Sequence, residues 1–302
     1  MHGDERLASG IVPGNTTMDS GHFLSLNITQ PLDLATTLES GQAFRWRRQG
    51  PWYYGVLQDN LVALKQKGTR LDVRSAGSPT QQIESSLQDY LRLDDDLEAI
   101  YSVIDTDHRM NGAITEYHGL RILRQDPWEC LVSFICSANS NIPRISATVE
   151  SLAQNYGRPL RLGDYVDYSF PTPEKLADAG EAALRDLKLG FRAKYVAQAA
   201  EKVGRGEVKL ELLRHLPYQD AKDALTSIAG VGDKVADCVL LFSLDKLDAC
   251  PIDRWVRRAM EEWYLDGAKL NYKAIRAWSL ERWGEYAGYA QQYLFHQKRL
   301  QG

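Results

Sequence analysis

Lys234 is the side chain whose type and position most directly suggest chemistry. The segment Leu225–Asp237 predicts a helix, a tight Gly-Val-Gly hairpin and a second helix that holds Lys234 in its first turn. The positive end of a helix dipole disfavours a protonated amine, and burial acts in the same direction. We therefore expect part of the Lys234 population to be a neutral amine nucleophile.

A carboxylate and a phosphate-binding turn accompany this lysine. Asp253 comes 19 residues later, at the end of Cys250-Pro251-Ile252-Asp253 and at the start of another predicted helix. Gly230 and Gly232 have no Cβ, so the backbone can turn sharply and approach a ligand closely. The first amides of the second helix have no intrahelical partner and attract a phosphate. For the hairpin alone, a helix turn that binds no ligand is the alternative interpretation.

Together these segments closely resemble the helix–hairpin–helix DNA glycosylases with a Gly/Pro-rich loop and a catalytic Asp, the HhH-GPD superfamily. Within that superfamily the chain is similar to the 8-oxoguanine DNA glycosylases with an associated lyase activity, over about residues 22–297. The resemblance implies that Lys234 is the nucleophile and Asp253 the catalytic carboxylate. Cys238 lies on the helical face of Lys234 and matches the family's lesion pocket. A small buried apolar residue is the alternative interpretation of this cysteine.

The resemblance also gives the hairpin backbone two roles. Three amides would bind DNA phosphate, those of Gly230, Gly232 and Val235. Three carbonyls would hold a structural monovalent cation that bridges to phosphate, those of Thr226, Ile228 and Val231. The resemblance implies no required cofactor.

Two segments match the residues with which the family reads the damaged base. In Ser40–Trp46, the carbonyl of Gly41 would accept a hydrogen bond from N7–H of 8-oxoguanine. Guanine has no hydrogen there, so an unpaired buried acceptor would reject it by roughly a few kcal/mol. On a later helix, Gln291 would bind the Watson–Crick edge of the extruded base and Phe295 would stack on it. The alternative interpretations are an ordinary turn glycine for Gly41 and a plain amphipathic helix for Gln291 and Phe295.

Two more segments match the residues that engage the cytosine left opposite the lesion. Asn139 and Arg144 lie at a predicted junction of two helices, where the family's second of three asparagines is replaced by Ser140. Arg192 matches a second arginine, and Phe191 takes the place of a tyrosine that wedges into the base stack, for which a flat apolar ring suffices. The alternative interpretations are a C-cap for Asn139, a solvated helix residue for Arg144 and ordinary helix–helix packing for Phe191.

Trp255 and Lys298 depart from the family's pattern together. The family often has His two residues after the catalytic Asp and Asp three residues after the stacking Phe. The replacement loses an imidazole that contacts phosphate and its carboxylate partner. We expect altered DNA affinity and a broader tolerance of the opposite base, with catalysis retained.

The resemblance implies a bifunctional DNA repair enzyme. It would flip out and excise 8-oxoguanine opposite cytosine in double-stranded DNA, form a Schiff base through Lys234 and cleave the strand by β-elimination. An alkylpurine glycosylase of the same fold would use Asp253 without a lysine at 234. A non-catalytic helix–hairpin–helix DNA-binding protein would need only the hairpin and would leave Lys234 without a purpose.

The elements that must position these residues fall into three parts. Residues 1–20 predict a flexible polar tail, 21–107 a β-rich domain and 108–302 a helical HhH-GPD domain with its hairpin at 225–237. The expected fold class is α+β, with a small antiparallel β domain ahead of an all-helical body. The resemblance implies two lobes in that body, with the cleft between them near the hairpin.

Local patterns place some of these elements. Trp52–Leu57 and Leu61–Leu64 flank a predicted turn at Gln58–Asn60, and Arg70–Arg74 alternates as a half-exposed strand should. After Ser78-Pro79 the pattern is helical and stays so. The helix signals are a cap followed by proline at Asp126-Pro127 and Thr172-Pro173, and a terminating glycine at Gly190.

The composition of the chain favours an intracellular protein and is compatible with DNA binding. The net charge is −4, but residues 1–110 hold 15 acids against 10 Lys and Arg, so the remainder is close to neutral. Such a helical body can bind DNA through a few contacts, with a shallow salt dependence. No apolar run approaches the ~20 residues of a membrane helix, and no secretion signal is evident at the N-terminus. We expect an intracellular monomer, in the cytoplasm and nucleoid or in the nucleus.

The four cysteines argue against three other classes of protein. Their positions, 130, 136, 238 and 250, do not suit a disulfide framework or a zinc site. They also do not match the four-cysteine iron–sulfur pattern of the endonuclease III branch. We therefore expect no iron–sulfur cluster.

Overall fold

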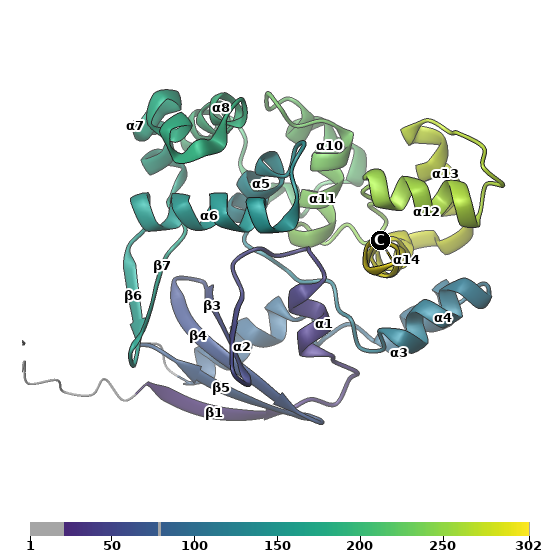
Figure 1. Cartoon of the computed structure of the whole chain (residues 1–302), viewed down its shortest axis with the longest axis horizontal. Helices are drawn as coiled ribbons and strands as arrows, with labels where there is room; N and C mark the ends of the chain where they lie inside the picture. The colour runs from purple at the N-terminus through teal and green to yellow at the C-terminus, as the bar shows by residue number, and fades with distance from the viewer. Residues whose placement is uncertain (1–20, 78–79, 302) are drawn as a thin grey trace, which may run out of the picture.

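The computed structural model describes residues 21–77 and 80–301. The predicted tail over residues 1–20 and the Ser78-Pro79 boundary lie outside the described residues. In Figure 1 a sheet occupies the lower part of the molecule and most of the helices lie above it and to its right.

The N-terminal part is a five-stranded antiparallel sheet with the strand order β1-β5-β4-β3-β2. The strands are β1 His22–Asn27, β2 Arg47–Gln49, β3 Trp52–Leu57, β4 Asn60–Lys67 and β5 Arg70–Ser75. The predicted hairpin is confirmed, with a shorter turn than expected, because Asn60 already pairs with Leu57. Gln58 and Asp59 make this turn with φ of 46° and 62°, which suits the right-handed twist of the strands.

The strand β5 departs from the simple alternation predicted for it. Asp72 is 5% exposed although it stands at a position expected to face solvent. Its carboxylate accepts a hydrogen bond from Ser25 at 2.7 Å and pairs with Arg70 at 2.6 Å and Lys65 at 3.4 Å. The neighbouring strands therefore satisfy this acid and cover it.

Two helices complete the N-terminal part, α1 Leu34–Glu39 and α2 Thr80–Tyr90. Their apolar residues join those of the strands in a core of their own, which runs from Leu24 to Leu91 and includes Leu123. A second core begins at Leu97 and includes Phe44 from the N-terminal part. The expected boundary between residues 107 and 108 stays a prediction.

The helices that follow form two groups in Figure 1. The group above the sheet holds α5 Pro127–Cys136, α6 Ile142–Tyr156, α7 Pro173–Leu184, α8 Arg192–Gly204, α10 Tyr218–Thr226 and α11 Asp233–Ser243. The short helix α9 Leu210–Leu213 lies against α5 and α10. The group to the right holds α3 Leu97–Ile104, α4 His108–Glu116, α12 Arg254–Trp263, α13 Tyr272–Trp283 and α14 Ala287–Leu300. Short π and 3-10 segments, Arg185–Leu189 and Gly284–Tyr286, precede α8 and α14.

The predicted helix signals are confirmed. The Asp126 carboxylate accepts a hydrogen bond from the Glu129 amide at 2.8 Å and begins α5, with Pro127 in its first turn. Thr172 accepts from the Lys175 amide at 3.4 Å and begins α7. Gly190 ends the π segment with a φ of 61°.

The expectation that the chain stays helical after residue 79 is wrong at one place. Pro159–Leu162 and Tyr165–Tyr168 form a two-stranded antiparallel sheet, β6 and β7, joined by a turn in which Gly163 has a φ of 59°. The ring of Tyr165 stacks on Tyr54 of β3 at 4.2 Å between centroids. Each strand has only four residues, so their alternation is too short to register as a pattern.

Candidate active site

The hairpin places Lys234 at the start of a buried helix. Gly230 has a φ of 83°, and a Cβ on it would come within 2.4 Å of Cγ of Tyr195. Glycine is therefore required here for both conformation and space. Gly232 then precedes α11, whose residues from Val235 to Ser243 are all buried. A buried helix offers little freedom to move, so Lys234 projects from a rigid base.

The Lys234 amine is held by the end of α5. Its Nζ atom donates a hydrogen bond to Oγ of Ser137 at 3.0 Å and lies 5.0 Å from the ring centroid of Phe134. Ser137 in turn donates to the Phe134 carbonyl at 2.7 Å. The hydroxyl therefore has a fixed orientation in which its oxygen can accept from the lysine.

Asp253 is the N-cap of α12. One of its oxygens accepts hydrogen bonds from the amides of Trp255 at 2.8 Å and Val256 at 2.9 Å. These bonds fix the side chain at the helix start, as an N-cap requires. The carboxylate is partly exposed, so its second oxygen remains available to a ligand.

Cys238 links the two candidate catalytic residues. Its side chain is 2% exposed, and burial raises the pKa of its thiol to about 12. Lys234 lowers this pKa and Asp253 raises it, so both charges act on the same sulfur. The fold thus brings Lys234, Cys238 and Asp253 together from α11 and the start of α12. At this pKa the thiol stays protonated and is not a nucleophile.

Gly41 and Phe295 are in contact, although they lie near opposite ends of the chain. Gly41 has a φ of 83°, and a Cβ on it would come within 2.7 Å of Cδ1 of Ile142 and 3.3 Å of Cε1 of Phe295. Gln292 supports the contact, because its amide donates to the Ser40 carbonyl at 3.3 Å. Three segments therefore meet here: the end of α1, the start of α6 and the last helix.

Gln291 has an unused acceptor. Its side chain is 3% exposed, and its Oε1 atom has no hydrogen-bond partner among the described residues. A buried amide oxygen without a partner is costly and is rare in folded proteins. One turn of α14 separates it from Phe295, so the amide and the ring belong to the same helical face.

The sequence comparisons identify the family. Residues 25–131 match the family described as 8-oxoguanine DNA glycosylase, N-terminal domain, and residues 132–285 match the HhH-GPD superfamily base excision DNA repair proteins. The N-glycosylase/DNA lyase OGG1 of Arabidopsis thaliana is 35% identical over 87% of this chain and 76% of its own. The chain belongs to the 8-oxoguanine DNA glycosylase branch of the HhH-GPD superfamily.

Solved HhH-GPD structures share the whole architecture. A structure described as MBOgg1 in complex with a low-affinity DNA ligand is 36% identical, covers 93% of this chain and 97% of its own, and has a TM-score of 0.89. The 8-oxoguanine glycosylase/lyase of Clostridium acetobutylicum, in complex with double-stranded DNA containing cytosine opposite 8-oxoG, is 31% identical with a TM-score of 0.86. That match covers 94% of this chain and 99% of the other.

This HhH-GPD chain exposes three of the residues expected at the opposite base and buries the fourth. Asn139, with a φ of 49°, and Arg144 are exposed at the α5–α6 junction, where Asn141 caps α6. Phe191 is 49% exposed. Arg192 is 3% exposed and donates to the carbonyls of Cys136 at 2.8 Å and Leu189 at 3.2 Å. The guanidinium of Arg192 thus holds the backbone that precedes this junction.

Lys298 and Trp255, the two residues that depart from the family's pattern, both contact charged side chains. The Lys298 amine pairs with Glu262 at 2.5 Å and lies 4.9 Å from the ring centroid of Trp263. The Trp255 ring has two guanidinium groups over it, Arg254 at 5.0 Å and Arg258 at 5.6 Å. A positively charged, partly aromatic surface therefore begins at the residue after Asp253.

Two residues of the site were missed by the sequence analysis. They are Ser137 and Ile142, for which the sequence predicted no role. Ser137 follows Cys136 at a helix end, where serine commonly bonds its own backbone, so no local signal distinguishes it. Only the packing of α5 against α11 reveals its contact with Lys234.

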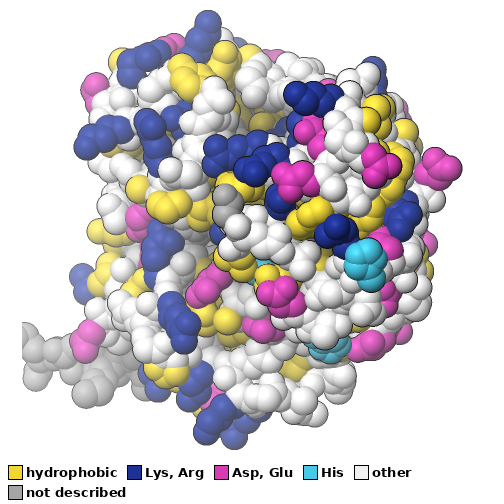
Figure 2. All heavy atoms as spheres, turned by 45° about the vertical axis from the view of Figure 1, so that its right-hand side comes forward, with side chains coloured by type: hydrophobic (Ala, Val, Ile, Leu, Met, Phe, Trp, Pro, Cys, Tyr) yellow, Lys and Arg dark blue, Asp and Glu magenta, His cyan; other side chains and the backbone are white. Residues whose placement is uncertain are grey.

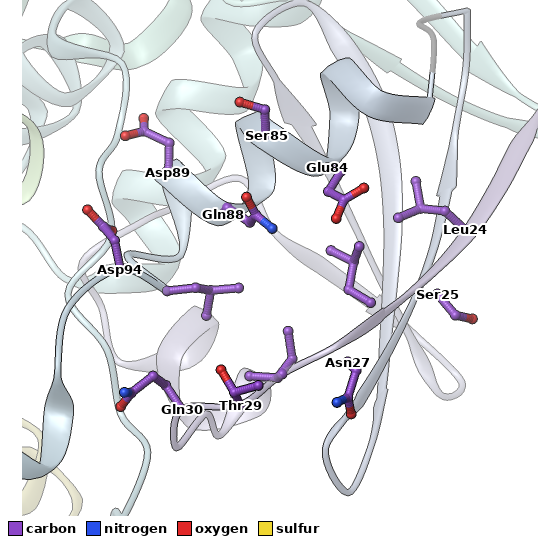
Figure 3. A pocket seen from close by; sticks show the side chains of 13 residues that line it. Leu24, Ser25, Asn27, Thr29, Gln30, Glu84, Ser85, Gln88, Asp89 and Asp94 are labelled. Carbon is purple, nitrogen blue, oxygen red and sulfur yellow. The ribbon is translucent and has the colours of Figure 1, made fainter.

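Charged side chains are unevenly distributed over the surface, and one hollow lies away from the predicted site residues. In Figure 2, Lys and Arg side chains are more frequent on the upper and left parts of this face, and Asp and Glu on its right part. A hollow of about 520 Å³ between β1 and α2 is lined by polar and apolar side chains, among them Leu24, Asn27, Thr29, Glu84 and Gln88 (Figure 3). It contains none of the predicted site residues.

Over residues 21–77 and 80–301, no group of three or more His, Cys, Asp or Glu is arranged to hold a metal ion. The cysteines at 130, 136, 238 and 250 are buried and unpaired in the same ranges. No helix among these residues is long and apolar enough to cross a membrane.

Proposed function

We propose that this chain excises 8-oxoguanine from double-stranded DNA and cleaves the resulting abasic site as a lyase. The single observation that carries the proposal is the Lys234 amine, held at 3.0 Å by Ser137 at the end of α5, in a chain of this branch of the superfamily. An amine on a rigid helix and a carboxylate held by two amides are the groups that this chemistry requires.

Base loss is the first step. The bond between C1′ and the base nitrogen breaks, and its electron pair leaves with the base. Positive charge develops on the sugar, and the Asp253 carboxylate stabilises it by electrostatic attraction. The neutral amine of Lys234 attacks C1′ and forms the new C–N bond. Ser137 supports this step by orienting the amine.

Strand cleavage follows from the covalent intermediate. The sugar ring opens as its oxygen takes a proton, which leaves a Schiff base between C1′ and Nζ of Lys234. A base removes one proton from C2′, the electron pair forms a C–C double bond, and the C3′–O bond breaks with the phosphate as the leaving group. Water then hydrolyses the Schiff base and frees the lysine.

The damaged base would lie between Gly41, Gln291 and Phe295, with Cys238 at the edge of its pocket. The unpartnered Oε1 of Gln291 supports this assignment, because an extruded base can donate to it. The Gly41 carbonyl would accept N7–H of the lesion. Asn139, Arg144 and Arg192 would engage the opposite cytosine, and the exposed Phe191 would fill the space that the extruded nucleotide leaves.

The hairpin would hold the DNA backbone. The amides of Gly230, Gly232 and Val235 would bind phosphate, and the carbonyls of Thr226, Ile228 and Val231 would hold a monovalent cation. The Val231 amide donates to the Ile228 carbonyl at 3.1 Å, which closes the turn that carries these carbonyls. Neutral carbonyl oxygens are suitable ligands for a monovalent cation that prefers oxygen ligands. The catalytic steps need no cofactor.

Borohydride trapping tests the function. The protein would be mixed with duplexes that hold 8-oxoguanine opposite each of the four bases, and the reduced protein–DNA adduct would be measured. We expect an adduct with the lesion opposite cytosine and none with Lys234→Gln, which should still bind the duplex. An adduct in Lys234→Gln would place the nucleophile elsewhere. Excision of the base without any adduct would favour the alkylpurine-type alternative. Binding of the duplex without excision or adduct would favour a non-catalytic DNA-binding protein.

A further inference from the structure

Asp237 is a buried carboxylate one helical turn after Lys234. It is fully buried on α11 and has no role in the steps above. The Tyr218 and Tyr272 hydroxyls each donate to it at 2.6 Å, and the Lys222 amine lies 3.2 Å away. A buried charge is tolerated only when it is paired and hydrogen-bonded in this way. Asp237 thus joins three helices, α10, α11 and α13.

Tyr272 extends this cluster to the segment that carries Asp253. Its hydroxyl oxygen lies 3.4 Å from the amide of Ile252 and 3.3 Å from the carbonyl of Cys250. Burial and the Asp237 carboxylate raise the pKa of this hydroxyl, so it keeps its proton. The Tyr272 hydroxyl donates its hydrogen bond to the Asp237 carboxylate at 2.6 Å, and its oxygen accepts a hydrogen bond from the Ile252 amide.

A continuous path of bonds therefore connects the two catalytic residues. Lys234 and Asp237 are three positions apart on one buried helix, so their relative positions are fixed. From Asp237 the path runs through the Tyr272 hydroxyl to the amide of Ile252, the residue before Asp253. Tyr218 binds the same carboxylate at the same distance, but its other contacts are with Lys222 at 3.0 Å and with Arg276, 3.8 Å from its ring centroid.

We propose that Asp237 and Tyr272 are positioning residues that hold the Asp253 carboxylate at its working distance from Lys234. This proposal rests on the proposed function, because the distance between Lys234 and Asp253 matters only if both residues take part in catalysis. A misplacement of about 1 Å can cost about a hundredfold in rate, so a single bond that sets this distance has a measurable effect. The other two partners of Asp237 stabilise the cluster without reaching the Asp253 segment.

Two tyrosine variants form a matched pair for the test. Tyr272→Phe and Tyr218→Phe each remove one hydroxyl that donates to Asp237 at 2.6 Å, and each keeps the ring. Their losses of thermal stability should therefore be similar. Only Tyr272→Phe also removes the link to Ile252. We expect the single-turnover rate of 8-oxoguanine excision to fall roughly tenfold in Tyr272→Phe, part of the loss that a misplacement of about 1 Å can cause. It should fall less than about twofold in Tyr218→Phe.

A double-mutant cycle separates positioning from general weakening of the fold. In an Asp253→Asn background there is no carboxylate to position, so adding Tyr272→Phe should change the remaining excision rate less than about twofold. A tenfold fall in that background as well, or equal falls in the two tyrosine variants, would overturn the proposal. If the unmodified chain excises no 8-oxoguanine, the proposed function fails first. Normal excision with an unaffected Tyr272→Phe would remove only the positioning role.

Discussion

The Nζ atom of Lys234 donates a hydrogen bond to the Oγ atom of Ser137 at 3.0 Å, across 97 positions of the sequence. The contact joins the start of α11 to the end of α5, so it orients the amine from outside its own helix. A long flexible side chain loses rotamer freedom when it is held in one place. This bond therefore prepares the amine for attack before DNA arrives.

The first prediction concerns this bond. Ser137→Ala leaves Lys234 in place but removes the acceptor, so the amine should sample orientations away from C1′. A typical intramolecular hydrogen bond contributes about 1 kcal/mol net, which corresponds to a fall of roughly fivefold in the rate of borohydride adduct formation. Ser102→Ala on α3 is the matched control, because the Ser102 hydroxyl also donates to the carbonyl three residues earlier, at 2.7 Å, and its rate should stay unchanged. Equal rates in Ser137→Ala and the unmodified protein would remove the orienting role.

The second prediction separates base recognition from strand cleavage. Gly41→Ala would strain the backbone at a φ of 83° and push a methyl group against Ile142 and Phe295. Excision of 8-oxoguanine should fall by about tenfold or more, the scale of an overpacking penalty of about 1–3 kcal/mol. Cleavage of a preformed abasic site needs no base contact and should be spared. The measurement is the ratio of the two rates, and an unchanged ratio in a folded variant would make Gly41 an ordinary turn glycine.

The third prediction distinguishes the two arginines expected to read the opposite cytosine. Arg144→Ala and Arg192→Ala should each reduce the preference for cytosine by about 1–3 kcal/mol. Arg192 is buried and bonded to two carbonyls, so its loss should also lower the melting temperature, whereas the exposed Arg144 should leave it unchanged. Excision opposite all four bases gives the preference. Equal losses opposite every base would show that these arginines act only on backbone contacts or on the fold.

The fourth prediction concerns the charged surface beside Asp253. Arg254 is exposed, lies over the Trp255 ring and is next in sequence to Asp253. If it contacts a phosphate, Arg254→Ala should lower the slope of log affinity against log salt by about 0.9 for duplex DNA. Lys67→Ala, at the far end of β4, is the control and should leave the slope unchanged. The titration uses undamaged duplex at several salt concentrations, and an unaltered slope in Arg254→Ala would exclude the contact.

The fifth prediction is a pH dependence of stability. Burial and the Arg299 guanidinium lower the pKa of His296 to about 4. The unfolded chain, with a histidine pKa of about 6.5, binds the additional proton as the pH falls from 6.5 towards 4. The free energy of unfolding should therefore fall over this range, by about 2–3 kcal/mol from this group at pH 4.5.

His296→Gln removes the titrating ring and keeps a polar side chain. The difference between the unfolding free energies of the two proteins, measured in urea from pH 7.5 to 4.5, isolates this group from the carboxylates that titrate in both. The difference should change by about 2–3 kcal/mol across the range. A constant difference would contradict the assigned pKa.

The parts of the fold that follow from local patterns agree with the sequence analysis. The caps at Asp126 and Thr172 depend on a side chain and an amide three residues away, and both are confirmed. The β3–β4 hairpin depends on adjacent residues and is confirmed too. These features are predictable because the interaction that defines each of them lies within a few residues.

The features that escaped prediction depend on distant partners. Asp72 is buried because Ser25 and Lys65 reach it from other strands. Arg192 turns inward because the Cys136 carbonyl lies 2.8 Å away, 56 positions earlier. Neither contact leaves a trace in the local pattern of the sequence. Lys234 and Asp253 could be proposed as a catalytic pair only because their spacing matched a known family, since the sequence alone does not bring Lys234 near Asp253.

The contact of Gly41 with Phe295 has a consequence for biosynthesis. A ribosome releases the N-terminal part first, and domains usually begin to fold in that order. Lys234 and Asp253 both emerge before α14, so the reactive pair can assemble while the base pocket still lacks its last wall. If Gly41, Gln291 and Phe295 form the base pocket as proposed, selectivity for the damaged base is the final property that a nascent molecule acquires. A chain shortened before residue 287 would lack Gln291 and Phe295, while Lys234 and Asp253 would still be present.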